Sequence, residues 1–128
     1  MDSALYDAAL ADILAQRLDW AKDEFCVALV QRGYKFSPAH TSFADIAAHV
    51  NGNSDVLTGC KTEGKAALAG RAYVLALRGA YSDQVVVYRK AAKAGSMRLV
   101  AWANITPVQP VPGQRIDISW PDGCVFTL

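Results

Sequence analysis

The sequence predicts a mainly β, single-domain fold: a β-sandwich or partly open barrel, of jelly-roll or immunoglobulin-like type, with one amphipathic helix at the N-terminus. Three observations lead to this prediction. Short apolar segments recur between turn-forming residues along most of the chain. Helical periodicity is found near its start. The chain has 128 residues, 52% hydrophobic and 20% charged, which is enough for one buried core. We expect one domain over residues 1–128, with the helix over 1–18 and the β-sandwich over 22–128.

The first element is a helix that we expect to begin at a Ser3 cap and to end near Leu18. An i, i+3, i+4, i+7 pattern gives it one apolar face, made of Tyr6, Ala9, Leu10, Ile13 and Leu14. Such a face covers either the core of its own domain or a surface of a partner protein.

The segment EFCVALV, residues 24–30, predicts a strand that is apolar on both faces and therefore central or sandwiched. Three further apolar segments predict strands over 71–77, 83–90 and 98–105. With the C-terminal segments described next, we expect about six strands.

The chain ends in a predicted β-hairpin. Ile116, Ile118 and Trp120 alternate with polar residues, and the alternation resumes over 124–128. Between them, the segment 121–123 (Pro-Asp-Gly) has the composition of a turn. The last strand must be paired or covered, because an open apolar edge promotes aggregation.

The remaining segments are predicted to be irregular. Residues 33–50 contain a Ser-Pro break, followed by a short helix from Phe43. The segment KAALAG, residues 65–70, could form one helical turn. Three connections are expected, namely a loop at 51–55 (NGNSD), a small-residue loop at 91–96 and a rigid proline-rich connector at 106–113.

Composition and charge exclude several classes of protein. A formal net charge of +1 argues against a nucleic-acid or anionic-lipid partner. No apolar run approaches the roughly 18 residues of a membrane-spanning helix. The first residues, MDSALYDAAL, lack the basic start and apolar core of a signal peptide. We therefore expect a protein that folds in a reducing cytoplasm and binds neither nucleic acid nor membrane.

The chain has no recognisable catalytic or metal-binding motif. His40 and His49 are nine residues apart, whereas a helical metal pair would be three or four apart. The cysteines, Cys26, Cys60 and Cys124, are an odd set without CxxC spacing. GxSxG, Walker-type and GxGxxG motifs are absent from the sequence. We expect neither an enzyme nor a bound metal or cofactor.

Aromatic residues offer an alternative interpretation, a β-sandwich module that binds carbohydrate through Trp120, Trp102 or Tyr81. Most aromatic residues, however, occupy strand positions where an ordinary core requires bulk. Trp120, immediately before Pro121 at the rim of the predicted hairpin, is the one that we expect to be half exposed.

Read in order, the phrases of the chain resemble a family of small virion proteins encoded among the structural genes of tailed bacteriophages. The resemblance spans essentially the whole chain, and order and spacing carry it. It departs from the family pattern at Cys60 and at Pro121. The matching phrases are ALYDAAL (4–10), LDWAKDEFCVALVQRGY (18–34), SFADI (42–46), LTGCKTEGKAALAG (57–70), VVVYRK (85–90), SMRLVAWANI (96–105) and PVQPVPGQRIDISWPDGCVFTL (107–128).

The resemblance implies a structural protein of the virion, assembled in the host cytoplasm, with no catalytic motif. Its first implication is a capsid decoration, or cement, protein that contacts the major capsid protein and other copies of itself. The alternative is a minor tail or tail-tip component, whose partners would be tail proteins.

A docking role requires contact surfaces, and three segments are candidates: the N-terminal helix, the irregular residues 33–55 and the proline-rich connector at 106–113. Each segment has a simpler role as a cap or a connection. Together with the rim of the predicted hairpin, they supply the candidate interface residues Tyr6, Leu10, Ile13, Tyr34, Phe36, Phe43, Pro107, Pro110, Pro112 and Trp120.

Overall fold

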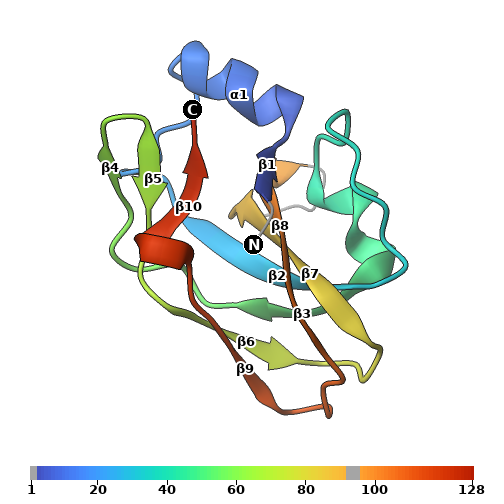
Figure 1. Ribbon diagram of the computed structural model, residues 1–128. Coiled ribbons are helices and arrows are strands. Elements are labelled where there is room, and N and C mark those ends of the chain that lie inside the picture. Colours follow the sequence, from blue (N-terminus) through green and yellow to red (C-terminus); the bar gives the residue numbers. More distant parts are fainter. Residues whose placement is uncertain (1–2, 92–95) are drawn as a thin grey trace.

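The computed structural model describes residues 3–91 and 96–128 and confirms a mainly β fold. Seven antiparallel strands form one curled sheet with the shape of a half-barrel (Figure 1). The predicted partly open barrel is therefore the form that the chain adopts. In spatial order the strands are β1 (Ser3–Leu5), β8 (Leu99–Val108), β7 (Ser82–Arg89), β2 (Phe25–Gln31), β3 (Val50–Ser54), β6 (Ala72–Ala76) and β9 (Arg115–Ile118).

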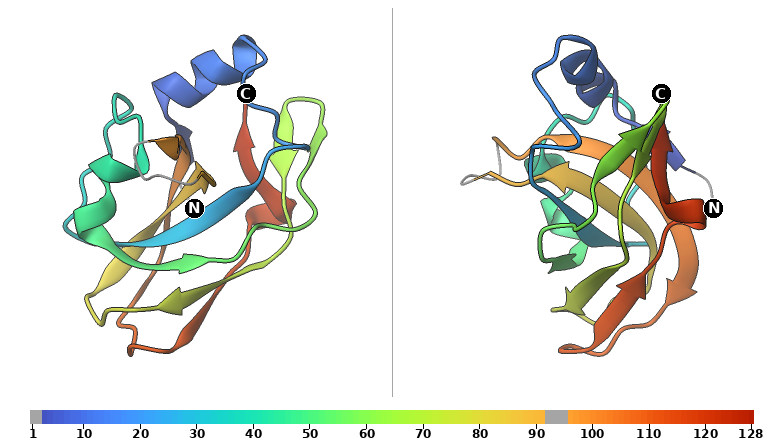
Figure 2. Two further views of the ribbon diagram at one scale, coloured as in Figure 1. Left: turned by 180° about the vertical axis from the view of Figure 1, so that it is seen from behind. Right: turned by 90° about the vertical axis from the view of Figure 1, so that its left-hand side faces the viewer.

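A second, three-stranded sheet lies beside one end of the half-barrel, next to the helix α1 (Asp7–Leu14) (Figures 1 and 2). The described residues thus form ten strands, more than the six or so that were predicted. The strands of the small sheet are β10 (Cys124–Thr127), β5 (Ala66–Leu68) and β4 (Lys61–Glu63), and the short 3-10 helices are η1 (Phe43–Asp45), η2 (Ala47–His49) and η4 (Pro121–Gly123).

The curl of the large sheet almost closes it. The right-hand view of Figure 2 shows the lower part of β8 beside β9, and residues 105–108 and 116–119 of these strands line one shallow cleft. β9 nevertheless pairs with β6 and not with β8. The sheet therefore has an open seam at this edge.

Strand β2 is central, as its composition predicted, and both of its faces are covered. It pairs with β7 on one side and with β3 on the other. On the inner face, Phe25 packs against Trp20, with ring centroids 4.4 Å apart, and Trp20 contacts Phe126 of the small sheet. The small sheet thus closes the inner core.

The outer face of β7 and β8 is covered by residues 34–49. Phe36 stacks on Trp102 with ring centroids 5.1 Å apart, and Phe43 packs on Tyr88 at 4.9 Å. The irregular segment of the sequence therefore serves as a lid over the centre of the sheet.

The N-terminal helix is shorter than predicted. Ser3–Leu5 form strand β1 on β8, so Ser3 does not cap the helix, and Tyr6 occupies the N-cap position. Tyr6 is fully buried, and its backbone N–H continues the ladder by donating to the Val100 carbonyl at 3.1 Å. The helical periodicity correctly predicted a helix, but residues 3–5 pair with β8 and belong to the sheet instead.

The helix ends at Leu14 rather than near Leu18, because Gln16 adopts a left-handed backbone conformation with φ of 61°. The Gln16 N–H donates to the Ile13 carbonyl, and the Arg17 N–H donates to that of Asp12 at 2.8 Å. This is a Schellman motif, with glutamine at the position where glycine is most frequent.

The segment predicted as a loop at 51–55 is the inner strand β3 for most of its length, so this prediction was wrong. Gly52 permits it, because a Cβ at that position would overlap the Leu75 carbonyl oxygen of β6. Glycine therefore serves here for close approach of two strands and not for a turn.

Three other predictions near the end of the chain and in the glycine-rich segment were also wrong. The predicted helical turn at 65–70 is strand β5. The C-terminal hairpin does not form, because β9 pairs with β6 and β10 pairs with β5 of the other sheet. The proline-rich connector is partly strand, since β8 extends to Val108. The loop predicted at 91–96 lies largely outside the described residues.

A candidate binding groove on the outer face of the sheet

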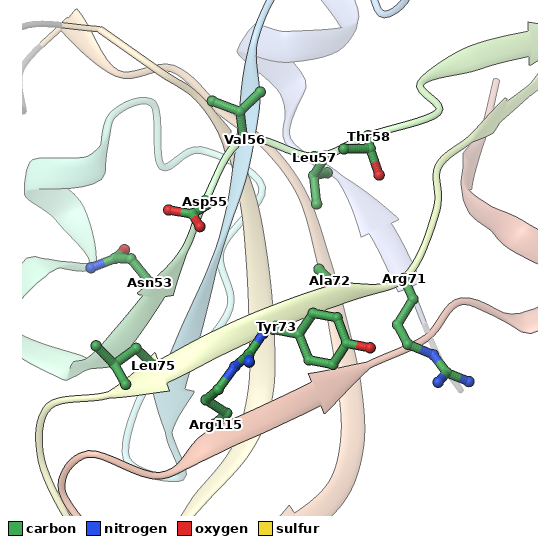
Figure 3. Close-up of a pocket in the computed structure, with 10 residues that line it drawn as sticks. All are labelled: Asn53, Asp55, Val56, Leu57, Thr58, Arg71, Ala72, Tyr73, Leu75 and Arg115. Atoms are coloured by element: carbon green, nitrogen blue, oxygen red, sulfur yellow. The ribbon is translucent and has the colours of Figure 1, made fainter.

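A groove of about 520 Å³ lies on the outer face of the large sheet, where β3 ends and β6 begins (Figure 3). The chain leaves β3 at Asp55, so the first part of β6 has no β3 partner. The space between β6 and residues 55–58 is the groove. Its lining residues are Asn53, Asp55, Val56, Leu57, Thr58, Arg71, Ala72, Tyr73, Leu75 and Arg115.

Strand β6 supplies the apolar part of the groove. Its buried side chains, such as Val74, alternate with outward ones. Tyr73 and Leu75 point outward and are each 47% exposed, and Leu77, just beyond the strand, is 63% exposed. We name these three residues the β6 stripe. Exposed residues of this size on consecutive outward positions are typical of a contact surface.

Arginine side chains border the β6 stripe. The Arg115 guanidinium lies 4.7 Å from the centroid of the Tyr73 ring, a cation–π geometry that holds both groups in place. Arg71 lies 3.4 Å from a carboxylate oxygen of Asp117, measured from Nη1 to Oδ2. Within residues 3–91 and 96–128, Arg115 forms no ion pair and is therefore available to an external carboxylate.

The opposite wall of the groove is held by hydrogen bonds. The Tyr88 hydroxyl donates to Oδ1 of Asn53 at 3.0 Å. The Leu57 N–H donates to the Phe25 carbonyl at 2.7 Å, which fixes the loop on β2. Because both walls are held by the fold, binding would cost little ordering entropy.

The lining combines apolar and aromatic side chains with two arginines, and it contains no histidine, cysteine or lysine. Among the described residues, no cluster of three His, Cys, Asp or Glu side chains could hold a metal ion. Tyr and Arg, both present in this lining, are enriched at protein interfaces.

The residues predicted to form an interface do not form one surface. Leu10, Pro107 and Pro112 are exposed, whereas Ile13, Phe36 and Phe43 are partly buried against the core. Four residues are buried in the domain itself: Tyr6, Tyr34, Pro110 and Trp120. The expectation that Trp120 is half exposed was wrong, because β9 and η4 turn its ring into the interior.

Tyr6, Tyr34 and Phe36 do come together, but inside the molecule. The hydroxyl oxygens of Tyr6 and Tyr34 are 2.8 Å apart, and that of Tyr34 lies 2.8 Å from Nδ1 of His40. Burial, reinforced by the Tyr34 hydrogen bond, raises the pKa of Tyr6 well above its usual range. This chain of hydrogen bonds fixes the lid at 34–49 on the sheet.

The aromatic rings considered for carbohydrate stacking are also in use. Trp120 is buried, and Trp102 stacks on Phe36 while its Nε1 donates to Gln84 at 2.7 Å. The Tyr81 ring carries the Arg32 guanidinium at 4.6 Å. Trp120 is therefore not accessible, and one ring face each of Trp102 and Tyr81 is already occupied within the domain.

The groove itself was missed in the sequence because residues 71–77 (RAYVLAL) are apolar in both phases of the strand. Such a run predicts burial on both faces. The available signal was the placement of Arg71, Arg78 and Arg115 at the ends of β6 and on its neighbour β9. Because the charged end of an arginine side chain stays in solvent, arginine beside an apolar strand indicates that one face of that strand is exposed.

Comparisons of the chain with protein-family models, with curated proteins and with solved structures give no match. Within the described part of the chain, no helix is long and apolar enough to cross a membrane. Function is therefore inferred from the groove and from the resemblance described above.

Proposed function

We propose that the protein is a structural component of a tailed-bacteriophage particle, and that it decorates the capsid shell by docking on the major capsid protein. The resemblance of the ordered phrases between residues 4 and 128 supports a virion protein. The groove supports docking, because it offers apolar area and arginine.

The observation that carries the proposal is the uncovered β6 stripe. Tyr73, Leu75 and Leu77 remain in water although the neighbouring centre of the same sheet is covered on both faces. Covering such a stripe gains about 25 cal/mol per Å² of apolar area. A specific interface of standard size buries roughly 800 Å² per partner, so the stripe and groove would form its central part.

Copy number tests the role in the particle. We expect purified virions to contain the protein in numbers comparable to those of the major capsid protein, measured by quantitative mass spectrometry. Removal of its gene should leave shells that assemble but rupture at lower temperature. A copy number of about three, six or twelve would instead indicate the tail component, as expected for a symmetric tail structure.

Binding of purified protein to shells that lack it tests the groove. Leu75→Glu places a charge in the apolar stripe, and Arg115→Glu reverses the charge at the rim. Each change should weaken binding about tenfold or more while leaving thermal stability unchanged, because both side chains point outward. Val111→Glu is the matched control, since Val111 is 65% exposed but does not line the groove. Unchanged binding of both groove variants would contradict docking through the groove.

A further inference from the structure

A second hollow, of about 460 Å³, is lined by residues of α1, of the segment after it and of the small sheet. These elements lie at the opposite end of the molecule from β6 and β9 (Figure 1). Its lining includes the apolar side chains of Ile13, Trp20 and Phe126. Its rim carries one acidic and one basic side chain, Asp19 and Lys65. This end of the molecule therefore has a cavity with apolar side chains in its lining and both signs of charge around it.

A large exposed apolar residue follows directly after a residue that lines this hollow. Leu14, on the last turn of α1, is 74% exposed, although its neighbour Ile13 lines the cavity. The left-handed Gln16, also in the lining, ends the helix here and directs the chain away. Leu14 is therefore largely uncovered by its own chain and adjoins, in the sequence, a residue of the hollow.

The charges of the rim are equally unmatched within one copy. Neither Asp19 nor Lys65 forms an ion pair within residues 3–91 and 96–128. A contact with two-fold symmetry places a surface patch of one copy against the identical patch of the other. Such a contact is complementary only if the patch itself contains both members of each matching pair, for example both an acidic and a basic side chain. This patch contains both an exposed leucine and a hollow, and both an acid and a base.

We propose that two copies of the chain associate through this surface about a two-fold axis. Leu14 of each copy enters the hollow of the other, and Asp19 of each copy faces Lys65 of the other. The two grooves at β6 then lie at the far ends of the dimer. A dimer would turn a single docking groove into a bridge between two shell subunits, with the gain in avidity that linkage brings.

The bridging role rests on the proposed function, whereas the dimer can be tested on the isolated protein. Sedimentation equilibrium of the full chain should show a concentration-dependent monomer–dimer equilibrium. Leu14→Glu should raise the dimer dissociation constant about tenfold or more, because it places a charge in an apolar hollow. Val111→Glu is the control: it adds the same charge at a similarly exposed apolar residue that lines neither the hollow nor the groove, and it should leave the equilibrium unchanged.

A charge exchange tests the two-fold geometry itself. Asp19→Lys or Lys65→Glu alone should weaken the dimer, because like charges then face each other twice. An equimolar mixture of the two variants should restore association, since each rim again meets the opposite charge. Thermal melting of each variant verifies the fold, which matters for Asp19 because its Oδ1 also accepts the Ala21 N–H.

A wild-type chain that remains monomeric at millimolar concentration would overturn the proposal. Association that Leu14→Glu leaves intact, or that the mixture of exchanged variants does not restore, would overturn it as well. None of these outcomes bears on the copy number in virions or on shell binding through the groove, so the two proposals fail separately.

Discussion

The centre of the large sheet and its outer strands use side chains in opposite ways. The centre, formed by β2, β3 and β7, buries polar side chains, among them Asn51 and Gln84. The outer strand β6 exposes apolar ones, Tyr73 and Leu75. Buried polar and exposed apolar residues are the two informative departures from an ordinary domain, and this protein separates them in space.

Asn51 and Gln84 are both hydrogen-bonded, which is why the centre tolerates their burial. Asn51 is 0% exposed, and its Nδ2 donates to the Ala80 carbonyl at 2.6 Å and to the Ser82 hydroxyl. Its Oδ1 accepts from Gln31 at 2.9 Å. Gln84 donates to the carbonyls of Gln31 and Tyr34, which ties the lid to β7. The comparison teaches that polar pairing fixes the architecture inside, while the outward apolar side chains of β6 remain uncovered by the rest of the chain.

The largest expected effect is a loss of stability when the close approach of β3 to β6 at Gly52 is disturbed. Gly52→Ala should destabilise the fold by about 3 kcal/mol or more, because the added Cβ overlaps the backbone of β6 and the strands must separate. Urea unfolding followed by tryptophan fluorescence measures the change. Gly33→Ala is the control, since a Cβ there meets nothing within 4 Å. A loss below about 1 kcal/mol at Gly52 would show that β3 and β6 are less closely packed than described.

The next largest effect is the loss of stability expected when the buried hydrogen bonds of Asn51 are removed. Asn51→Ala should cost about 2 to 4 kcal/mol, since it leaves the Gln31 amide and the Ala80 carbonyl without this partner in a buried site. Amide hydrogen exchange should locate the loss at residues 77–82. Asn53→Ala is the matched control, because it removes only the acceptor of the Tyr88 hydroxyl and should cost about 1 kcal/mol. Equal costs for the two variants would contradict a special role for Asn51.

Much of the fold could be predicted from the sequence where strands are apolar. β2, β6, β7 and β8 lie within one or two residues of the predicted segments at one end or both, because a buried strand must be hydrophobic whatever its neighbours are. β3 could not be predicted, since asparagine and glycine favour turns locally. Its stability comes from tertiary features: the amide network of Asn51 and the close approach at Gly52.

The separation of β9 and β10 into two sheets illustrates the same limit. Pro-Asp-Gly at 121–123 forms the expected turn, but Asp122 and Gly123 have φ of 54° and 74° within the 3-10 helix η4, and the chain is redirected to β5. Turn composition specifies a change of direction and not the strand that is reached. The groove could not be predicted for a related reason: when a strand is apolar on both faces, its sequence does not show which face is exposed to solvent.

The smallest expected effect sharpens the comparison within a single strand. Val74 and Leu75 are neighbours on β6, but Val74 is fully buried and Leu75 is 47% exposed. Val74→Ala should cost about 2 kcal/mol through lost burial and the cavity left behind, whereas Leu75→Ala should change the free energy of unfolding by less than about 0.5 kcal/mol. Thermal and urea unfolding of the two variants at one protein concentration measure this difference.

The same pair distinguishes a surface kept for a partner from one that stabilises the chain itself. If Leu75→Ala costs as much as Val74→Ala, Leu75 is part of the core, and the uncovered stripe that supports docking does not exist. If Leu75→Ala is neutral for unfolding but lowers binding to shells, the exposed leucine contributes to association alone. A residue with that combination contributes no stability to the isolated chain, so its apolar character is accounted for by the partner that covers it.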